Sequence, residues 1–159
     1  MSDQSLTIES ILSPALTRRG LAGTSKKKAL EDIANMVAAH YPFLDEHTLF
    51  NNLVCRERLG STGIGHGVAI PHCRLENCDR VIGALVTLDN PVDWDAIDQQ
   101  PVDILFALIV PQEATGEHLD LLSQLARRFN SPVFREAIRN ARSDDELLRV
   151  AVSDQVQEQ

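Results

Sequence analysis

Apolar residues recur every three or four positions in five segments of the chain, which is the spacing of helices with one buried face. In the first of these segments, Leu30, Ile33 and Val37 form such a stripe. Capping residues begin most of the segments, and Gly60 is a typical stop for the second. The expected helices span residues 24–40, 45–59 and 115–129, and two shorter ones begin at Ser131 and Ser143.

Three other segments are almost continuously apolar, which is typical of strands buried on both faces. They are Val68–Ile70, Val81–Leu88 and Val102–Val110. Pro71 indicates a sheet edge or a strand irregularity after the first, and Asp89–Gln100 is expected to be a long connection between the other two. Helices precede and follow the strands, so the order predicts an α/β or α+β fold with the strands between helical layers.

Composition places the chain among ordinary globular proteins. Its 159 residues are 43% hydrophobic and 24% charged, which suits one domain, expected over residues 6–153 with flexible polar tails at 1–5 and 154–159. The formal net charge of -8 argues against general nucleic-acid binding, because phosphate contacts need a basic surface. Without a signal-peptide pattern or an apolar run long enough for a bilayer, we expect a cytoplasmic protein with no membrane insertion and with reduced thiols.

The most unusual segment is residues 61–72, which read STGIGHGVAIPH. Four glycines fall within eight positions from Gly60 onward, and no Asp, Glu, Lys or Arg occurs between Gly60 and Cys73. Bare glycine N–H groups can approach and hold an anion, and Pro71 stiffens the approach to His72. The pattern favours a phosphoryl site, although a loop that merely connects two elements fits the spacing equally well. It matches neither a Walker A loop nor a dinucleotide fingerprint.

His118 and two arginines are further candidates for such a site. His118 falls in the first turn of a helix that follows a strand end, on the same face as the apolar positions. It can therefore face a ligand crevice, or it can be a satisfied core histidine. Arg56 and Arg58 end the helix before the glycine-rich segment, where they can reach a phosphate or simply complement the helix dipole.

Two further clusters of residues could bind something other than a phosphoryl group: a lysine-rich turn and a set of histidines and cysteines. Lys26–Lys28 open the first helix, either as a solvated basic turn or as a docking patch for a partner. Four residues could ligate zinc, but their H-x5-H-C-x4-C spacing is wider than that of structural zinc pairs. These residues are His66, His72, Cys73 and Cys78.

The segment from Arg56 to His72, RERLGSTGIGHGVAIPH, resembles the signature of enzyme IIA of the bacterial phosphotransferase system, fructose/mannitol type. It is most similar to the nitrogen-regulatory branch of that family. The resemblance continues through residues 95–111 and His118-Leu119 and covers roughly residues 6–153. It implies a single-domain mixed β-sheet flanked by helices on both sides.

The resemblance also assigns roles to the candidate residues. His72 matches the phosphorylated histidine, His118 matches the second active-site histidine, and Arg56 matches the motif arginine, whereas Arg58 falls at a variable position. Phosphoryl transfer would then form a covalent phosphohistidine without metal, nucleotide or other cofactor. Charge on the passing group could be stabilised by Arg56, by a proton on His118 and by the loop. The expected loop residues are Ser61, Thr62, Gly63, Gly65 and Gly67.

The implied donor is a small histidine-phosphocarrier protein, which enzyme I charges from phosphoenolpyruvate. In this branch the output is regulatory: phosphorylation controls binding to other proteins and is linked to nitrogen and potassium metabolism. Two alternatives remain. One is a sugar-system IIA that passes phosphate to a separate IIB protein. The other is a phosphate-independent interaction module, against which the intact His72 and His118 argue.

Two residues depart from the family pattern. His66 lies where a small or amide residue is expected, and Cys73 follows His72 where glycine or another small residue is usual. His66 is expected to face solvent, with a role in the pH dependence of the site as the alternative. Cys73 raises the possibility of redox sensitivity.

Overall fold

The computed structural model describes residues 7–114 and 116–153. The expected tails, 1–5 and 154–159, and the expected helix start at Thr115 lie outside the described residues. The helices are α1 (Ile8–Ile11), η1 (Pro14–Leu16, a 3-10 turn), α2 (Lys26–His40), α3 (Glu46–Leu59), α4 (Glu117–Phe129), α5 (Pro132–Asn140) and α6 (Asp144–Val152). The strands are β1 (Thr17–Leu21), β2 (Gly63–Gly65), β3 (Val68–Ala69), β4 (His72–Leu75), β5 (Ile82–Val92) and β6 (Val102–Pro111).

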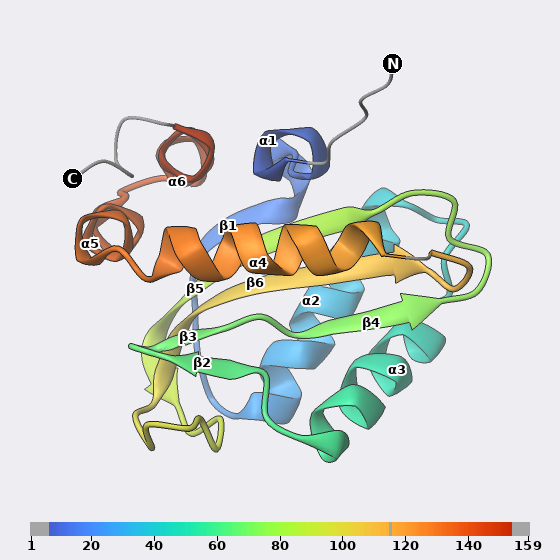
Figure 1. The fold of residues 1–159 in the computed structure, drawn as a ribbon, viewed down its shortest axis with the longest axis horizontal. Coiled ribbons are helices and arrows are strands. Elements are labelled where there is room, and N and C mark those ends of the chain that lie inside the picture. Colours follow the sequence, from blue (N-terminus) through green and yellow to red (C-terminus); the bar gives the residue numbers. More distant parts are fainter. Residues whose placement is uncertain (1–6, 115, 154–159) are drawn as a thin grey trace.

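The strands form one mixed sheet between two helical layers (Figure 1). Its order is β1-β5-β6-β3-β2, and β4 also pairs with β6. Strands β3 and β4 run parallel to β6, whereas β5 runs antiparallel to it. The centre of the sheet is therefore β6, whose residues are almost all buried, as the continuous apolar run predicted.

Strands β3 and β4 are one strand interrupted at Ile70 and Pro71. Val68 pairs with Ile104 and His72 with Leu108, so the register against β6 is the same on both sides of the break. Proline has no N–H to donate to a ladder, which accounts for the interruption. The irregularity expected from Pro71 is confirmed, and it falls directly before His72.

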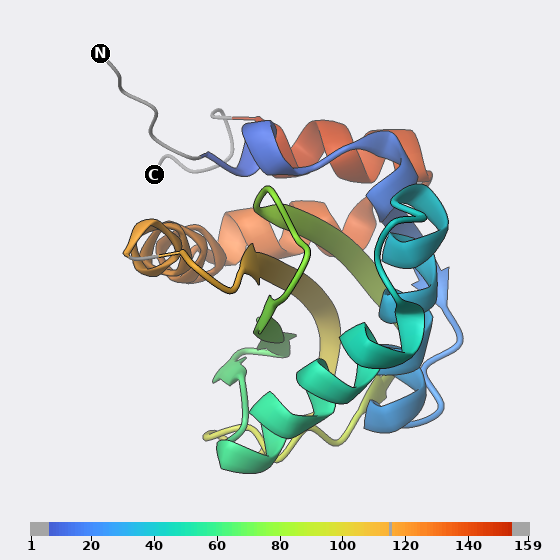
Figure 2. The ribbon, with the colours of Figure 1, turned by 90° about the vertical axis from the view of Figure 1, so that its right-hand side faces the viewer.

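Each face of the sheet has its own apolar core, and Figure 2 shows the two helical layers from the side. Helices α2 and α3 cover one face through residues such as Leu30, Ile33 and Leu53. Helices α1, α4, α5 and α6 cover the other, where Phe129 and Phe134 pack edge to face. The expected fold class, a mixed sheet flanked by helices on both sides, is confirmed.

The helix ends follow the predicted caps closely. The side chains of Ser25, Asp45 and Ser131 each accept a hydrogen bond from a backbone amide in the first turn of the helix that follows. Ser143 caps α6 as expected, but its S-x-x-E sequence, which could form a reciprocal capping box with Glu146, does not complete one. The Glu146 carboxylate accepts from the amide of Arg142 instead of from that of Ser143.

Several strands differ from the prediction. Strands β1, β2 and β4 were not expected, because they are short and their sequences are polar or rich in glycine. The expected connection at residues 89–100 is shorter than predicted, since β5 continues through Pro91 to Val92. The pairing shifts register between Thr87 and Val92, and a proline is tolerated at such an irregularity. None of the helices in the described part of the chain is long and apolar enough to cross a membrane.

Candidate active site

His72 is the first residue of β4, and a single hydrogen bond orients its ring. Its Nδ1 lies 2.7 Å from the carbonyl oxygen of Ile70. A carbonyl only accepts hydrogen bonds, so Nδ1 must carry the proton in this contact. The other ring nitrogen, Nε2, is therefore left with its lone pair in the neutral imidazole.

The Ile70 carbonyl is open to His72 because the neighbouring ladder ends there. The Ile70 amide donates to the Thr62 carbonyl over 3.0 Å, which is the last contact between the two segments before the break. The chain before Thr62 turns into the end of α3, where the Gly60 amide donates to the Glu57 carbonyl. The short β2 and the proline break together direct one backbone carbonyl to the histidine ring.

A pocket of about 450 Å³ opens beside His72, between α3 and the start of α4. The pocket includes His72, Arg56 and His118, the three residues to which the family resemblance assigns a catalytic role. Its wall is Asn52, Cys55, Arg56 and Leu59 of α3, His72, Cys73 and Arg74 of β4, Leu108 and Val110 of β6, and His118. The structure thus brings together side chains that are up to 66 positions apart in the sequence.

His118 is half-buried in the first turn of α4, as the helical spacing predicted. Its Nδ1 is buried and meets no hydrogen-bond partner within residues 7–114 and 116–153. Leu121, Leu125 and Phe129 of the same helix are buried, whereas Leu122, which the spacing also places on the face of His118, is only partly buried. The ring therefore stands where the buried stripe of α4 reaches the pocket.

Arg56 contacts the C-terminal end of α3 and also lines the pocket. Its Nη1 donates to the Gly60 carbonyl over 2.8 Å, at the C-terminal end of α3, and its side chain lines the pocket. Its positive charge also lowers the pKa of His72, because it disfavours a second positive charge nearby. Arg58 is exposed and does not line this pocket among the described residues.

The expected phosphoryl-binding loop is held away from the pocket by contacts of its own. The Ser61 hydroxyl donates to the Trp94 carbonyl over 2.7 Å, and the Thr62 hydroxyl donates to the Glu57 carboxylate. None of Ser61, Thr62, Gly63, Gly65 and Gly67 is among the described residues that line the pocket.

Two glycines of this loop are required by close packing and by a turn of the backbone. A side chain on Gly63 would collide with Ala96, and one on Gly67, whose φ is +81°, would collide with the Arg139 guanidinium. Both contacts lie outside the pocket. Local packing and backbone conformation therefore account for glycine at these two positions without a bound ligand.

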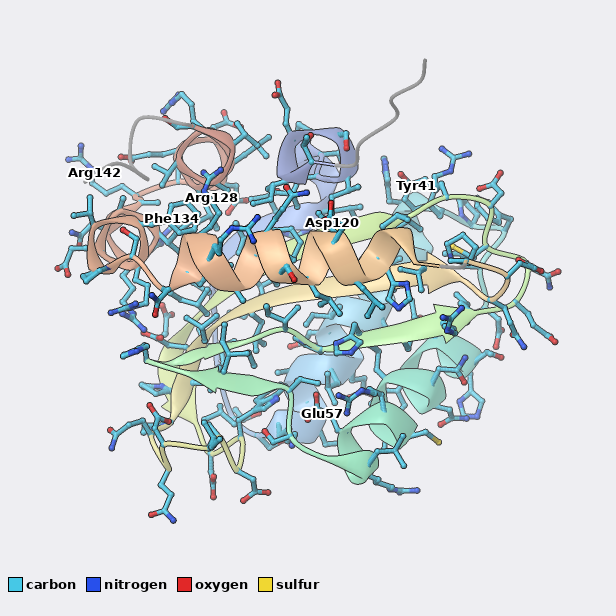
Figure 3. The ribbon with its side chains drawn as sticks, viewed as in Figure 1. Tyr41, Glu57, Asp120, Arg128, Phe134 and Arg142 are labelled. Carbon is cyan, nitrogen blue, oxygen red and sulfur yellow. The ribbon has the colours of Figure 1, made fainter. Side chains whose placement is uncertain are left out.

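Glu57 is the centre of a network that sequence reasoning missed. Its carboxylate, 5% exposed, pairs with Lys26 over 3.0 Å and accepts from the Thr62 amide over 3.2 Å. The Trp94 indole donates to the Thr62 hydroxyl over 3.2 Å, and Lys26 lies over the Trp94 ring. Figure 3 shows Glu57 between α2 and α3, on the side of the sheet away from α4. The network ties the segment after α3 to α2 and to the β5–β6 connection.

The remaining sequence candidates lie in ordinary structural environments. His66 is exposed at the β2–β3 turn, where its amide donates to Asp98. Cys73 is buried, and burial raises the pKa of its thiol to about 12, which disfavours the reactive thiolate. No group of three or more His, Cys, Asp or Glu side chains that could hold a metal occurs in the described ranges. Of the basic turn, Lys26 belongs to the Glu57 network and Lys28 pairs with Asp32.

The pKa of His72 is expected to lie below the ordinary histidine value of about 6.5. Burial is the main cause, and the charges of Arg56 and His118 act in the same direction, against the Ile70 hydrogen bond and Glu57. The ring should thus stay neutral when pH falls somewhat below 6.5. Since the unfolded chain binds the proton first, this group should make the fold less stable as pH falls through that window.

An NMR titration of the His72 ring protons measures this pKa directly. Arg56→Gln should move the midpoint to higher pH, because it removes one of the positive charges that oppose protonation. A midpoint above 6.5 in the unsubstituted protein would show that the site favours the charged ring, contrary to the geometry described above.

Comparisons with known proteins show the family of this chain. The family described as "Phosphoenolpyruvate-dependent sugar phosphotransferase system, EIIA 2" matches residues 10–152. The nitrogen regulatory protein of Pseudomonas aeruginosa is 48% identical over 147 residues, which cover 92% of this chain and 96% of that protein. The Escherichia coli K12 protein of the same name is 42% identical over 150 residues, covering 94% and 91%.

Solved structures give the same result. The nitrogen regulatory protein IIA-Ntr from Neisseria meningitidis superposes with a TM-score of 0.84 at 37% identity, covering 90% of this chain and 97% of that one. The mannitol IIA of Escherichia coli shares the fold, with a TM-score of 0.68 at 15% identity and coverage of 86% and 96%. The chain therefore belongs to the EIIA 2 family of the phosphoenolpyruvate-dependent sugar phosphotransferase system, in its nitrogen-regulatory branch.

Proposed function

We propose that the protein accepts a phosphoryl group on Nε2 of His72 from a histidine-phosphocarrier protein and signals through its phosphorylation state. The observation that carries the proposal is the contact between Nδ1 of His72 and the Ile70 carbonyl. It leaves Nε2 as the nucleophile, in a pocket that Arg56 and His118 share. Membership of the family supports the same role for the histidine.

The transfer needs only groups that the two proteins supply. The Nε2 lone pair of the neutral ring attacks the phosphorus of the carrier's phosphohistidine, and the P–N bond of the carrier breaks with its electron pair returning to the carrier's imidazole. Positive charge develops on the His72 ring, where the Ile70 carbonyl accepts a hydrogen bond from Nδ1–H and so stabilises the charge. Arg56 stabilises the negative oxygens of the passing group.

His118 is assigned to hold the phosphoryl oxygens by hydrogen bonding from its ring. His118→Ala is expected to bind the charged carrier with little change but to slow transfer, by about tenfold or more, because the removed interaction acts mainly in the transition state. Rapid-quench measurement of transfer at several carrier concentrations separates the two effects. An unchanged maximal rate in this variant would overturn the role given to His118.

Support for a regulatory output comes from the rim of the pocket. Leu59, which lines the pocket, is 84% exposed, and Leu119, which follows His118 in the sequence, is 60% exposed. Apolar side chains are therefore open to solvent beside a hollow with two imidazoles and an arginine. A phosphoryl group adds a charge of about -1.5 to -2 at such a rim. A partner that packs against the apolar rim of one form should therefore discriminate against the other form.

We further propose that the partners are linked to nitrogen or potassium metabolism, since the relatives compared above are named nitrogen regulatory proteins. The alternative, a sugar-system IIA, predicts rapid transfer from phosphorylated His72 to a sugar-specific IIB protein. Incubating the phosphorylated chain with purified IIB proteins and following the loss of its phosphoryl group distinguishes the two. Fast loss, with the phosphoryl group appearing on a sugar-specific IIB protein, would replace the regulatory proposal by the metabolic one.

A further inference from the structure

Arg74 lies two residues after His72 on β4 and reaches across to the segment that precedes α4. Its Nη1 donates to the carbonyl of Gln112 over 3.0 Å and to that of Ala114 over 2.6 Å. Hydrogen bonds from a charged donor to backbone carbonyls are among the stronger ones in proteins. The guanidinium therefore fixes two neighbouring carbonyls of the β6–α4 connection to β4.

The backbone of the same residue holds the other side of the pocket. The Nδ2 atom of Asn52 on α3 donates to the Arg74 carbonyl over 3.0 Å. Figure 1 shows β4 between α3 and α4, and Arg74 is thus bonded to the segments on both sides. These are the elements that carry Arg56, His72 and His118, one on each.

One backbone hydrogen bond also ties the connection to β4, from the Gln112 amide to the Leu75 carbonyl over 3.1 Å, but it lies at the β6 end of the connection. Nearer α4, the described residues offer few side-chain groups that could fix the helix start. Its N-cap is Gly116, which offers no side chain to the free amides of the first turn, and open space surrounds the glycine. His118 itself adds no anchor through Nδ1, which is buried without a hydrogen-bond partner within the described ranges. In the described part of the chain, the restraint from a side chain on the connection leading into α4 consequently comes from the two hydrogen bonds of the Arg74 guanidinium.

We propose that Arg74 is a positioning residue for phosphoryl transfer, which sets the distance between His118 and His72 by clamping the β6–α4 connection to β4. The inference rests on the function proposed above, because a distance between the two rings matters only if both act on one group. Misplacement of a reacting group by about 1 Å can cost up to 100-fold in rate. Loss of the clamp should therefore slow transfer more than it weakens binding of the carrier.

The test is a double-mutant cycle on the full chain, with transfer from the charged histidine-phosphocarrier protein followed by rapid quench. Arg74→Gln, whose shorter neutral side chain cannot bridge both carbonyls, is expected to lower the maximal rate about tenfold with little change in the half-saturating carrier concentration. Arg74→Lys, which can still reach one carbonyl, should lose less. In the His118→Ala background, Arg74→Gln should have almost no further effect.

Arg80→Gln is the matched control. Arg80 is an exposed arginine that pairs with Asp79 and lies over the Tyr41 ring, and it does not line the pocket. Its substitution should leave transfer unchanged. The ring signals of His118 in NMR spectra provide a second readout, because they should shift in Arg74→Gln and not in Arg80→Gln.

The outcomes separate this inference from the function on which it rests. If the unsubstituted protein accepts no phosphoryl group from a demonstrably charged carrier, the proposed function fails. If it does accept the group while Arg74→Gln transfers at the normal rate, only the clamp is refuted. If Arg74→Gln slows transfer equally with and without His118, Arg74 acts on the phosphoryl group itself, which overturns its role as a positioning residue.

Discussion

Replacing His72 by alanine is expected to abolish phosphorylation of the protein. The substitution removes the ring whose Nε2 the Ile70 contact leaves free, and Arg56, a guanidinium, cannot take its place as nucleophile. A loss of the nucleophile costs the whole reaction rather than a fraction of its rate, as for other enzymes that form covalent intermediates. Intact-mass measurement after incubation with phosphoenolpyruvate, enzyme I and the carrier shows whether one phosphoryl group has been gained.

The matched control for this experiment is His47→Ala. His47 is an exposed histidine in the first turn of α3 and does not line the pocket, so its variant should be phosphorylated like the unsubstituted protein. The His72→Ala variant should still fold, because His72 is only half-buried and lies at the end of a strand. A folded variant that still gains a phosphoryl group would place the acceptor on another residue.

Replacing Glu57 by alanine should produce the largest loss of stability among the polar residues discussed here. The carboxylate is 5% exposed, and its removal leaves Lys26 and the Thr62 amide without the partner that they now share. Breaking a buried ion pair by removing one partner typically costs 3–5 kcal/mol, so we expect a decrease of about 3 kcal/mol in the free energy of unfolding. The segment from Ser61 to Thr62 should loosen, which would also slow transfer to His72.

Urea unfolding at neutral pH measures this effect, and Glu31→Ala is the control. Glu31 is an exposed glutamate on α2 with a loose pair to Lys28 at 3.8 Å, and its loss should change the stability by no more than about 0.5 kcal/mol. Equal stability of the two variants would mean that the Glu57 network contributes no more than a surface pair. The supporting role that we assign to the network would then be wrong.

The sequence predicted the elements that bury a regular apolar pattern and missed those that do not. Helices α2 to α6 have helical stripes, all but α4 have a side-chain N-cap, and β6 has a continuous apolar run. Strand β1 lies at the sheet edge and exposes Arg18 and Arg19, so it lacks both signals. Strands β2 and β4 owe their pairing to β3 and β6, and a partner distant in the sequence leaves no local pattern.

The candidate site shows the same division. His72, Arg56 and His118 could be named from the family motif and from the helical position of His118, and the structure places them in one pocket. The contacts that hold the glycine-rich segment could not be predicted, because Lys26, Glu57 and Trp94 meet only in the fold. Arg74 and Asn52 were missed for the same reason, although Asn52 lies one helical turn before Arg56.

The most direct test of the account is to identify the nitrogen that carries the phosphoryl group. Proton–nitrogen NMR spectra of the ¹⁵N-labelled, phosphorylated protein assign both the histidine and the ring atom. The geometry predicts a single phosphohistidine at His72, substituted on Nε2, with Nδ1 still protonated by its contact with Ile70. Substitution on Nδ1, or on any residue other than His72, would contradict the account.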